Sequence, residues 1–316
     1  MKELRPTKVD ERNNALRQIS QALEQRNQTL AQAILERDLY FRVSLLGACN
    51  LRCPFCHNEG AGLDGIADLA FVTAAGKTAS HLGFRRIQLT GGEPLLHPEV
   101  DRFVATLRDT FSDVGITTNG TFLQSKIRSL LVSGVTRLHI SLQAEELRKW
   151  GSQESWGIPP WLIEILEMSS SAKIFLRLNM PIPASELQNA FGLLRDLAES
   201  GCDVKVFSIL PEGNERENTY PLALLRQEVD IENQRRRNER QQGMIVLRDF
   251  RQPQGFRCET CSDRNRCREQ SHSLRLGADR ILRPCLATRA WDSLLTEENM
   301  ETDIREASLL ALDYVW

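Results

Sequence analysis

The sequence lacks an excess of charge of one sign, a long hydrophobic run and any low-complexity segment. Lys and Arg together number 40 and Asp and Glu number 42, which gives a formal net charge of −2. This balance provides no general attraction to a nucleic-acid polymer or to an anionic membrane. No apolar run approaches the roughly 20 residues of a membrane span, and the first residues contain no apolar signal core. We therefore expect a cytoplasmic protein that binds neither membranes nor nucleic-acid polymers.

The composition supplies enough apolar side chains for a full core. Hydrophobic residues make up 41% of the 316-residue chain, which suits one large domain or two ordinary ones. In a cytosolic chain of this size, grouped cysteines more often bind metal or do redox chemistry than form disulfides. Cys202 stands alone and is expected to be a buried structural residue. The other cysteines fall into two groups: Cys49, Cys53 and Cys56, then Cys258, Cys261, Cys267 and Cys285.

The spacing of apolar residues predicts the secondary structure. Residues 9–36 predict one amphipathic helix, which we expect to cover an end of the fold rather than to bind a partner. From residue 39 onward, short apolar strands alternate with helix-length segments. The predicted strands are Tyr40–Leu46, Arg86–Leu89, Val114–Thr118, Arg137–Leu142, Ile174–Asn179 and Val204–Leu210. The predicted helices include Val100–Thr110, Leu123–Val132, Trp161–Met168 and Ser185–Ser200.

This alternation predicts an α/β fold. Six β-α repeats imply a parallel sheet with right-handed crossovers, curled into a partial (β/α)6 TIM-type barrel with its chemistry at the carboxyl ends of the strands. A polar run at residues 232–240 is expected to be a solvated helix rather than a nucleic-acid patch. The expected parts are an N-terminal helical extension (1–38), the partial barrel (39–212), a connecting segment (213–257) and an auxiliary cluster region (258–316).

The first cysteine group follows the first predicted strand. Cys49, Cys53 and Cys56 have the spacing C-x3-C-x2-C. Three thiolates can hold three irons of a [4Fe–4S] cluster and leave the fourth iron open to chelate a ligand. A structural zinc site would need a fourth ligand close by. His57 is adjacent to Cys56 and so is badly placed for that role, and we interpret it as a local structural residue.

A Gly-Gly-Glu-Pro motif follows the second predicted strand, at residues 91–94. Its two glycines let a ligand approach the backbone closely, and the Glu93 carboxylate can accept a hydrogen bond from an ammonium group. Alone, such a motif is a weak signal, because Gly and Pro mark turns in every fold. Because this motif stands one β-α unit after the cysteine loop, it is a specific signal here.

Together these motifs resemble the radical S-adenosylmethionine (SAM) superfamily, whose signature is C-x3-C-x2-C with an aromatic residue before the last cysteine. The resemblance implies that the open iron chelates SAM and that electron transfer cleaves SAM to methionine and a 5′-deoxyadenosyl radical. It also implies that Phe55 lies against the adenine. The residues that the resemblance assigns to the SAM site are Phe55, Gly91, Gly92, Glu93, Thr118, Ser141 and Leu210.

The second cysteine group could bind either iron–sulfur or zinc on its spacing alone. Beside a radical SAM core, an auxiliary [4Fe–4S] cluster held by Cys258, Cys261, Cys267 and Cys285 is favoured. From about residue 39 to 310, the order of motifs is similar to the MoaA-like GTP cyclases of molybdenum-cofactor biosynthesis. The C-x2-C-x5-C start of this group looks more like the SPASM/Twitch domains of peptide- and sugar-modifying radical SAM enzymes.

Departures from the cyclase pattern limit what the resemblance implies. The cyclase holds its second cluster with three cysteines, and four bound cysteines would leave no iron open to a guanine base. Gln88 stands where the cyclase has an Arg that contacts GTP, and Arg177 stands where it has a Lys, whereas Arg42 matches a retained Arg. The substrate-contacting candidates are Arg42, Gln88, Arg177 and Arg275.

The sequence therefore predicts a radical SAM enzyme with two [4Fe–4S] clusters and SAM as cofactors. We expect it to abstract a hydrogen from a small anionic substrate other than GTP, for which a nucleotide-like molecule is one candidate. The alternatives are the GTP 3′,8-cyclase itself, with Cys267 not a ligand, and a peptide-modifying SPASM/Twitch enzyme. A non-enzymatic iron–sulfur or zinc protein would have no use for the Gly-Gly-Glu motif. The expected partners are a small-molecule substrate and a reductant such as flavodoxin or ferredoxin.

Overall fold

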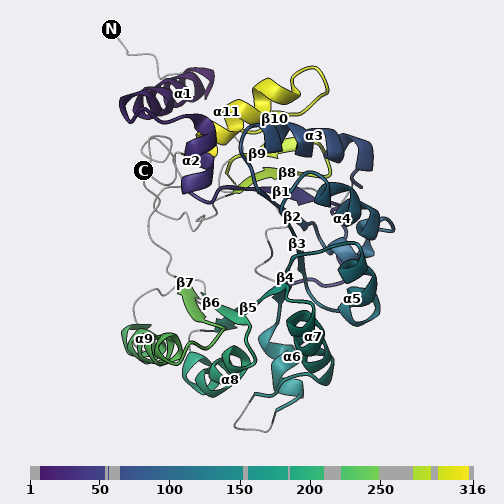
Figure 1. Cartoon of the computed structure of the whole chain (residues 1–316), viewed down its shortest axis with the longest axis vertical. Coiled ribbons are helices and arrows are strands. Elements are labelled where there is room, and N and C mark those ends of the chain that lie inside the picture. Colours follow the sequence, from purple (N-terminus) through teal and green to yellow (C-terminus); the bar gives the residue numbers. More distant parts are fainter. Residues whose placement is uncertain are drawn as a thin grey trace. The chain divides into compact units, whose positions relative to one another are not determined.

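The computed structural model describes residues 8–53, 56, 65–151, 156–183, 186–209, 222–248, 273–285 and 291–312. Figure 1 labels the helices and strands and colours them along the sequence, from purple at the N-terminus to yellow at the C-terminus. The chain divides into two compact units: Met1–Gly115 with Phe250–Trp316, and Ile116–Asp249. The division falls inside strand β3 (Asp113–Thr118).

The first unit is built on strands whose order across the sheet is β10-β9-β8-β1-β2. β1 pairs in parallel with β2 and with β8, so that a late segment of the chain extends the sheet that the first strand begins. β8, β9 and β10 pair antiparallel with one another in that order. The bounds are β1 Tyr40–Ser44, β2 Arg86–Thr90, β8 Ser273–Leu276, β9 Ile281–Arg283 and β10 Ser293–Leu294.

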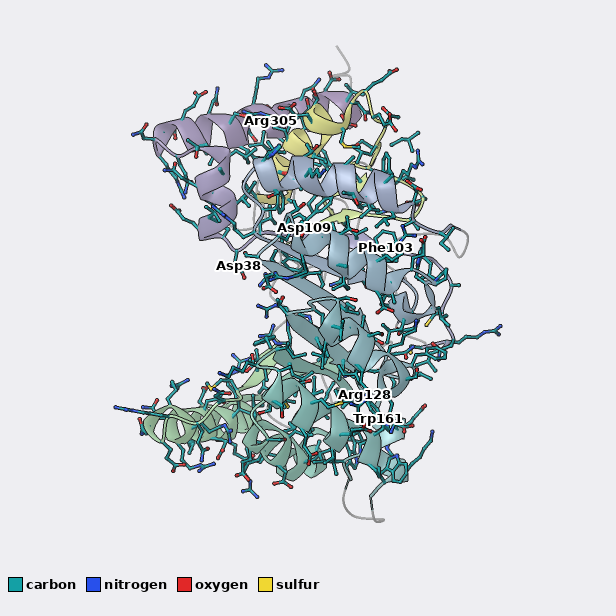
Figure 2. The ribbon with its side chains drawn as sticks, turned by 45° about the vertical axis from the view of Figure 1, so that its right-hand side comes forward. Asp38, Phe103, Asp109, Arg128, Trp161 and Arg305 are labelled. Carbon is teal, nitrogen blue, oxygen red and sulfur yellow. The ribbon has the colours of Figure 1, made fainter. Side chains whose placement is uncertain are left out.

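Helices pack on the apolar side chains of this sheet. Phe41, Val43, Ile87 and Leu89 are fully buried, as expected for strands of a parallel sheet. The helices are α1 Lys8–Gln25, α2 Leu30–Glu36, α3 Leu69–His81, α4 Val100–Arg108 and α11 Met300–Leu312. At the start of β1, Asp38 forms a 2.9 Å ion pair with Arg86; Figure 2 labels Asp38.

The N-terminal extension is two helices, so the prediction of one helix over residues 9–36 was wrong. Asn27 has a positive φ of 51°, and Thr29 begins α2 with a capping box: its hydroxyl accepts from the Gln32 amide while the Gln32 side chain accepts from the Thr29 amide. The apolar face was predicted correctly, because Ile19 is buried and α1 lies against α11, with an Arg12–Glu306 ion pair of 3.0 Å.

In its described residues, the second unit contains the parallel strands β4-β5-β6-β7, in that order, after the end of β3. Their bounds are β4 Arg137–Ser141, β5 Phe175–Pro183, β6 Asp203–Ile209 and β7 Ile245–Arg248. The helices are α5 Leu123–Val132, α6 Ala144–Lys149, α7 Pro160–Ser171, α8 Leu187–Glu199 and α9 Leu222–Asn238. The predicted α/β class with parallel strands is confirmed, and β5 runs four residues past its predicted end at Asn179.

β7 was not predicted from the sequence; it pairs in parallel with β6, and two side chains of α9 bond to it and to the segment before it. The Asn233 carboxamide both donates to the Ile245 carbonyl (2.7 Å) and accepts from the Ile245 amide (3.0 Å), as a neighbouring strand would. Arg236 is fully buried and donates to the carbonyl oxygens of Ala198 and Gly243. The polar run at 232–240 is therefore helical as expected through Asn238, but Arg236 is not solvated as expected.

Two further expectations can be compared with the described residues. Cys202 is 2% exposed and its thiol donates to the Leu197 carbonyl at 3.1 Å, which confirms a buried structural cysteine. Burial raises the pKa of this thiol to about 12. Within the described part of the chain, no helix has the length and apolar composition that crossing a bilayer requires.

Candidate functional site

The loop that contains the first cysteine group is closed at its base by backbone pairing. Leu46 and Ile66 form an antiparallel bridge, the Gly47 amide donates to the Gly65 carbonyl at 3.2 Å, and the Ala67 amide donates to the Leu45 carbonyl at 2.7 Å. The residues entering and leaving the loop therefore lie side by side at the carboxyl end of β1.

The three cysteines of this loop lie at or near the protein surface. Cys49 and Cys56 are exposed, Cys53 is partly exposed, and none of them is in a disulfide. The described residues include no group of three His, Cys, Asp or Glu side chains arranged around a single metal ion. A cubane cluster does not require such convergence, because each thiolate binds a different iron. Exposed thiols on one short loop fit that donor set; Phe55 and His57 lie outside the described residues.

The Gly-Gly-Glu motif lies directly against this loop. The Gly92 amide donates to the Leu46 carbonyl at 2.7 Å and the Glu93 amide donates to the Ala48 carbonyl at 2.9 Å. Gly91 has a φ of +155°, and a Cβ there would stand 2.5 Å from the Leu46 carbonyl oxygen; a Cβ on Gly92 would overlap the Ala48 carbonyl oxygen. Both glycines are thus required by the close approach of the two backbones.

Glu93 is a buried carboxylate at the centre of this contact. Its side chain is 0% exposed, and one oxygen accepts from the Leu95 amide at 3.1 Å, capping the short 3-10 helix Pro94–Leu96. A buried carboxylate favours a cationic or hydrogen-bond-donating partner. Its chemistry suits the ammonium group that the family resemblance assigns to it.

His97 links the Gly-Gly-Glu segment to the segment that leaves the cysteine loop. The imidazole is 2% exposed and lies edge-on to Phe103, with ring centroids 5.0 Å apart. Its Nδ1 accepts from the Glu99 amide (3.1 Å), so its Nε2 donates to the Ala67 carbonyl (3.3 Å). Burial lowers the pKa of His97, which keeps the ring neutral. Sequence reasoning missed this residue, because a single His beside a turn has no distinctive pattern.

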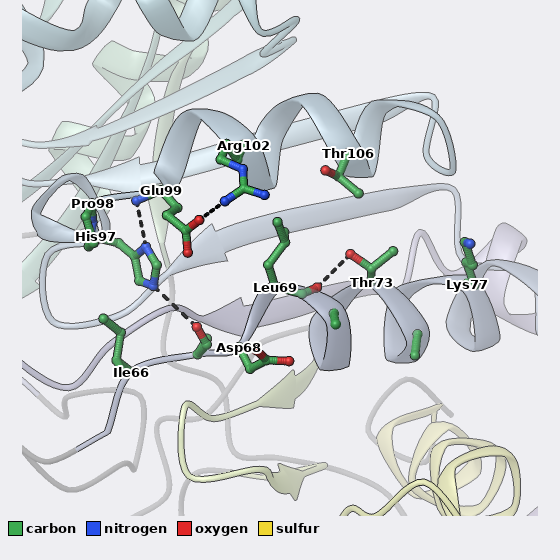
Figure 3. Close-up of a pocket in the computed structure, with 13 residues that line it drawn as sticks. Ile66, Asp68, Leu69, Thr73, Lys77, His97, Pro98, Glu99, Arg102 and Thr106 are labelled. Atoms are coloured by element: carbon green, nitrogen blue, oxygen red, sulfur yellow. Dashed lines mark hydrogen bonds and ion pairs between the residues drawn. The ribbon is translucent and has the colours of Figure 1, made fainter.

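A groove of about 830 Å³ lies between α3 and α4, and His97 is one of the residues that line it. Figure 3 shows Thr73 and Lys77 of α3 facing Arg102 and Thr106 of α4 across it. None of the residues predicted for SAM or cluster binding lines this groove. It is therefore not the candidate site.

Three of the predicted substrate residues lie at one level of the first unit's sheet. Arg42 on β1 is in register with Gln88 on β2 and with Arg275 on β8. In-register residues of neighbouring strands point to the same face, so two guanidinium groups and one carboxamide form a row. The Arg42 guanidinium donates to the Thr90 hydroxyl at 3.3 Å, next to the Gly-Gly-Glu motif. Gln88 is 1% and Arg275 5% exposed.

Arg283 extends this row to β9 but is neutralised locally. It is in register with Arg275, forms a two-point ion pair with Asp279 at 2.5 and 3.0 Å, and has Asp292 at 3.6 Å. The positive charge of Arg283 is therefore compensated by these two carboxylates.

The remaining predicted residues belong to the second unit. The Thr118 hydroxyl accepts from the Gly120 amide at 3.1 Å, and Trp161, labelled in Figure 2, packs against Gly120. Ser141 ends β4 opposite Asn179 of β5. Arg177 donates to Asp203 at 2.8 Å, so a substrate anion at Arg177 would compete with this ion pair. These assignments stay predictions, as does that of Leu210, which lies outside the described residues.

The second cysteine group is described at one position. Cys285 is buried and follows β9. Cys258, Cys261 and Cys267 lie outside the described residues, and the auxiliary cluster therefore stays a prediction.

Comparison with known proteins shows what this chain is similar to. Residues 43–149 match the model of the Radical SAM superfamily. The probable GTP 3′,8-cyclase of Aeropyrum pernix is 30% identical over 204 residues, covering 61% of this chain and 56% of that protein. The GTP 3′,8-cyclase of Microcystis aeruginosa is 41% identical over 114 residues, covering 33% and 34% respectively. The chain thus matches between about a third and somewhat over half of the length of these relatives.

A solved structure extends the likeness of fold beyond this domain. Streptococcus suis SuiB bound to S-adenosylmethionine has a TM-score of 0.57 at 16% identity and covers 80% of this chain and 63% of its own. At this identity the likeness concerns the fold alone, and it agrees with the α/β class with parallel strands. The predicted resemblance is confirmed: residues 43–149 match the Radical SAM superfamily, and the chain is similar to GTP 3′,8-cyclases.

Proposed function

We propose that this protein is an enzyme that binds SAM at a [4Fe–4S] cluster held by Cys49, Cys53 and Cys56 and cleaves it reductively. The observation behind this proposal is the contact between the Gly-Gly-Glu motif and the base of the cysteine loop. When bound, the cluster and SAM supply a 5′-deoxyadenosyl radical, the hydrogen-abstracting species of this superfamily.

The protein's own residues would orient this chemistry. Hydrogen bonds from Gly92 and Glu93 fix the start of the cysteine loop, and His97 fixes the segment that leaves it. The buried Glu93 carboxylate would accept hydrogen bonds from the SAM ammonium group. The lack of side chains at Gly91 and Gly92 keeps backbone groups close to the ligand.

The substrate we propose is a small anion other than GTP. Arg42 and Arg275 would bind its anionic group, because guanidinium groups match the geometry of phosphate and carboxylate. Gln88 stands in register with Arg42 at the position where the resemblance implies an Arg. Replacing a charged donor with a neutral one costs typically about 1.5–3 kcal/mol of a charge-assisted contact, so triphosphate binding would weaken.

The second candidate function is that of a GTP 3′,8-cyclase, which the names of the curated relatives favour. A further auxiliary [4Fe–4S] cluster on Cys258, Cys261, Cys267 and Cys285 is part of the main proposal. The C-x2-C spacing of its first two cysteines and the burial of Cys285 beside the strand β9 support it. A flavodoxin or ferredoxin as reductant, and a cytoplasmic location, remain expectations.

Ligand assignment can be tested on the purified full chain. After anaerobic reconstitution and reduction, the electron paramagnetic resonance spectrum of the first cluster should change on addition of SAM. Cys53→Ala should lose this SAM-dependent change. Cys202→Ala is the matched control, because Cys202 is buried and bonded to a backbone carbonyl. A Cys53→Ala protein with the full SAM-dependent change would contradict the assignment.

A further inference from the structure

The turn between β8 and β9, residues 277–280, is built around the carboxylate of Asp279. This carboxylate accepts from the Ile281 amide at 3.1 Å and forms a two-point ion pair with the Arg283 guanidinium. A Cβ on Gly277 would overlap Asp279 Oδ1 and stand 2.5 Å from Arg283 Nη1. The ion pair therefore occupies the space that a side chain at position 277 would need, and it fixes the shape of the turn.

Arg280 ends this turn in a conformation that an arginine rarely adopts. Its φ is +60°, in the left-handed region that disfavours residues with a Cβ. The Arg280 amide donates to the Gly277 carbonyl at 3.0 Å, and the Arg280 carbonyl accepts from the Leu295 amide at 2.9 Å. A residue persists in this region only where the surrounding structure holds it there. These hydrogen bonds fix the point from which the Arg280 side chain leaves the turn.

The turn lies against the segment that leaves the cysteine loop, residues 65–71, at both ends of that segment. The Arg280 guanidinium lies over the ring of Phe71, 4.2 Å from its centroid, and Phe71 belongs to the first turn of α3. At the other end, a Cβ on Gly65 would stand 3.5 Å from the Ala278 Cβ, which is ordinary van der Waals distance. The turn therefore borders the whole segment from the end of the loop to the start of α3.

The same segment closes the base of the cysteine loop. The Gly65 carbonyl accepts from the Gly47 amide, and the Ala67 amide donates to the Leu45 carbonyl. Cys49 stands two residues after Gly47. A shift of residues 65–71 would thus move the point at which the loop closes, and with it the first cysteine.

We propose that Arg280 is a positioning residue for the cysteine loop: through Phe71 it holds residues 65–71, so that the β8–β9 turn sets how the loop presents its cysteines and binds SAM. This inference rests on the proposed function and deepens it, because it gives the C-terminal part of the chain a role in SAM binding. Arg280 acts through its contact with Phe71, and Asp279 acts through the shape of the turn.

The contact is tested on the full chain by hydrogen exchange measured with mass spectrometry. Arg280 is exposed, so its replacement should leave the fold intact. An exposed cation–π contact changes an equilibrium by about two- to fivefold, and we expect amides in residues 65–71 to exchange faster by that factor in Arg280→Ala. Arg280→Lys should restore the wild-type rate, because an ammonium group can also lie over the ring. The peptide that contains β2 should be unchanged in both variants.

Arg305→Ala is the matched control, because Arg305 is an exposed arginine of α11 in the same unit; Figure 2 labels it. It should exchange as the wild type does. Gly277→Ala is a second, independent variant. The added Cβ displaces the ion pair of Asp279 with Arg283, and exchange in residues 65–71 should rise by at least the same factor as in Arg280→Ala.

The consequence for the ligand is read from the first cluster. The SAM concentration that gives half of the change in the electron paramagnetic resonance spectrum should rise about two- to fivefold in Arg280→Ala. Arg280→Lys should return it to the wild-type value. A role in folding alone would not move this concentration.

Three results would overturn the inference. These are unchanged exchange of residues 65–71 in Arg280→Ala, an equal rise in the β2 peptide, and an unchanged half-saturating concentration of SAM. The inference and the proposed function fail separately. If the reduced wild-type protein cleaves SAM but the variants exchange and bind SAM as it does, only the inference fails. If exchange responds as expected but the wild-type protein does not cleave SAM, the proposed function fails and the contact stands.

Discussion

The backbone amide of Gly92 donates a 2.7 Å hydrogen bond to the carbonyl of Leu46. This bond joins two motifs that stand about one β-α unit apart in the sequence. Ala48, two residues after Leu46, accepts from Glu93 at 2.9 Å, and Cys49 follows it. The position of the first cysteine is therefore set by the backbone of the Gly-Gly-Glu motif.

Gly92→Ala should disable the cysteine loop while leaving the fold intact. The added Cβ would overlap the carbonyl oxygen of Ala48 and stand 2.6 Å from that of Gly47, so the loop has to move. Since a displacement of about 1 Å at a reacting group can cost roughly 100-fold in rate, we expect a loss of that size. The measurement is the rate of 5′-deoxyadenosine formation. Gly192→Ala is the control, because no atom lies within 4 Å of a Cβ there, and its rate should match that of the wild type. A Gly92→Ala rate within twofold of the wild type would contradict this role of Gly92.

His97→Phe should loosen the segment that leaves the cysteine loop. The variant keeps an aromatic ring against Phe103 but removes the bonds to Ala67 and Glu99. The Ala67 carbonyl and the Glu99 amide are partly buried, and leaving them without a partner costs at most about 1–3 kcal/mol each. We expect the His97→Phe protein to lose iron to a chelator faster than the wild type does. The absorbance of the cluster measures this rate. Phe103→Leu, which keeps both hydrogen bonds, is the comparison, and equal rates of iron loss in the two variants would count against this role.

His97 also predicts a pH dependence of stability. Burial lowers its pKa in the folded protein below the value of about 6.5 that an unfolded chain has. Protonation therefore favours the unfolded chain, and this contribution to stability is present above about pH 6.5 and lost as the pH falls. Urea unfolding at pH 7.5 and 5.5 measures it. The decrease in the free energy of unfolding from pH 7.5 to pH 5.5 should be smaller in His97→Phe than in the wild type. An equal decrease in the two proteins would contradict the lowered pKa of His97.

Arg236→Met should destabilise the second unit. Its guanidinium is fully buried and donates to the carbonyls of Ala198, Gly243 and Gln242. Removing it leaves these carbonyls unsatisfied and Glu232 without its neighbour at 3.5 Å, which costs about 3 kcal/mol or more. Urea unfolding measures the loss. Arg237→Met, on the exposed side of the same helix, should change stability by less than about 0.5 kcal/mol.

Cys285→Ala tests the auxiliary cluster. Two [4Fe–4S] clusters amount to about eight irons per chain, and loss of one leaves about four. We expect the reconstituted variant to bind about four irons and to keep the SAM-dependent spectrum of the first cluster. Cys202→Ala should bind about eight. A Cys285→Ala protein with the wild-type iron content would remove Cys285 from the ligand set.

The predicted strands Arg86–Leu89 and Val114–Thr118 correspond to the observed Arg86–Thr90 and Asp113–Thr118, because their apolar residues are local and continuous. The sequence also contained the capping signal Thr29-x-x-Gln32, which divides the N-terminal helices. β7 could not be predicted, because its four residues become a strand by pairing with β6 and are further held by the Asn233 side chain of a distant helix.

At the candidate site, too, local patterns could be predicted from the sequence, whereas contacts between distant residues could not. The cysteine spacing and the Gly-Gly-Glu motif are local patterns, and they indicated the chemistry. The register of Arg42 with Arg275 joins residues far apart in the chain, and the contact of Arg280 with Phe71 depends on the packing of a turn against a helix. Neither relationship has a signal in the sequence alone.

The most direct test of the central claim is the amount of 5′-deoxyadenosine formed by the reconstituted, reduced wild-type protein with SAM, with and without GTP. We expect slow formation of 5′-deoxyadenosine that GTP does not stimulate. Strong stimulation by GTP would contradict the proposed substrate class and favour the cyclase. No 5′-deoxyadenosine under either condition would contradict the radical SAM function itself.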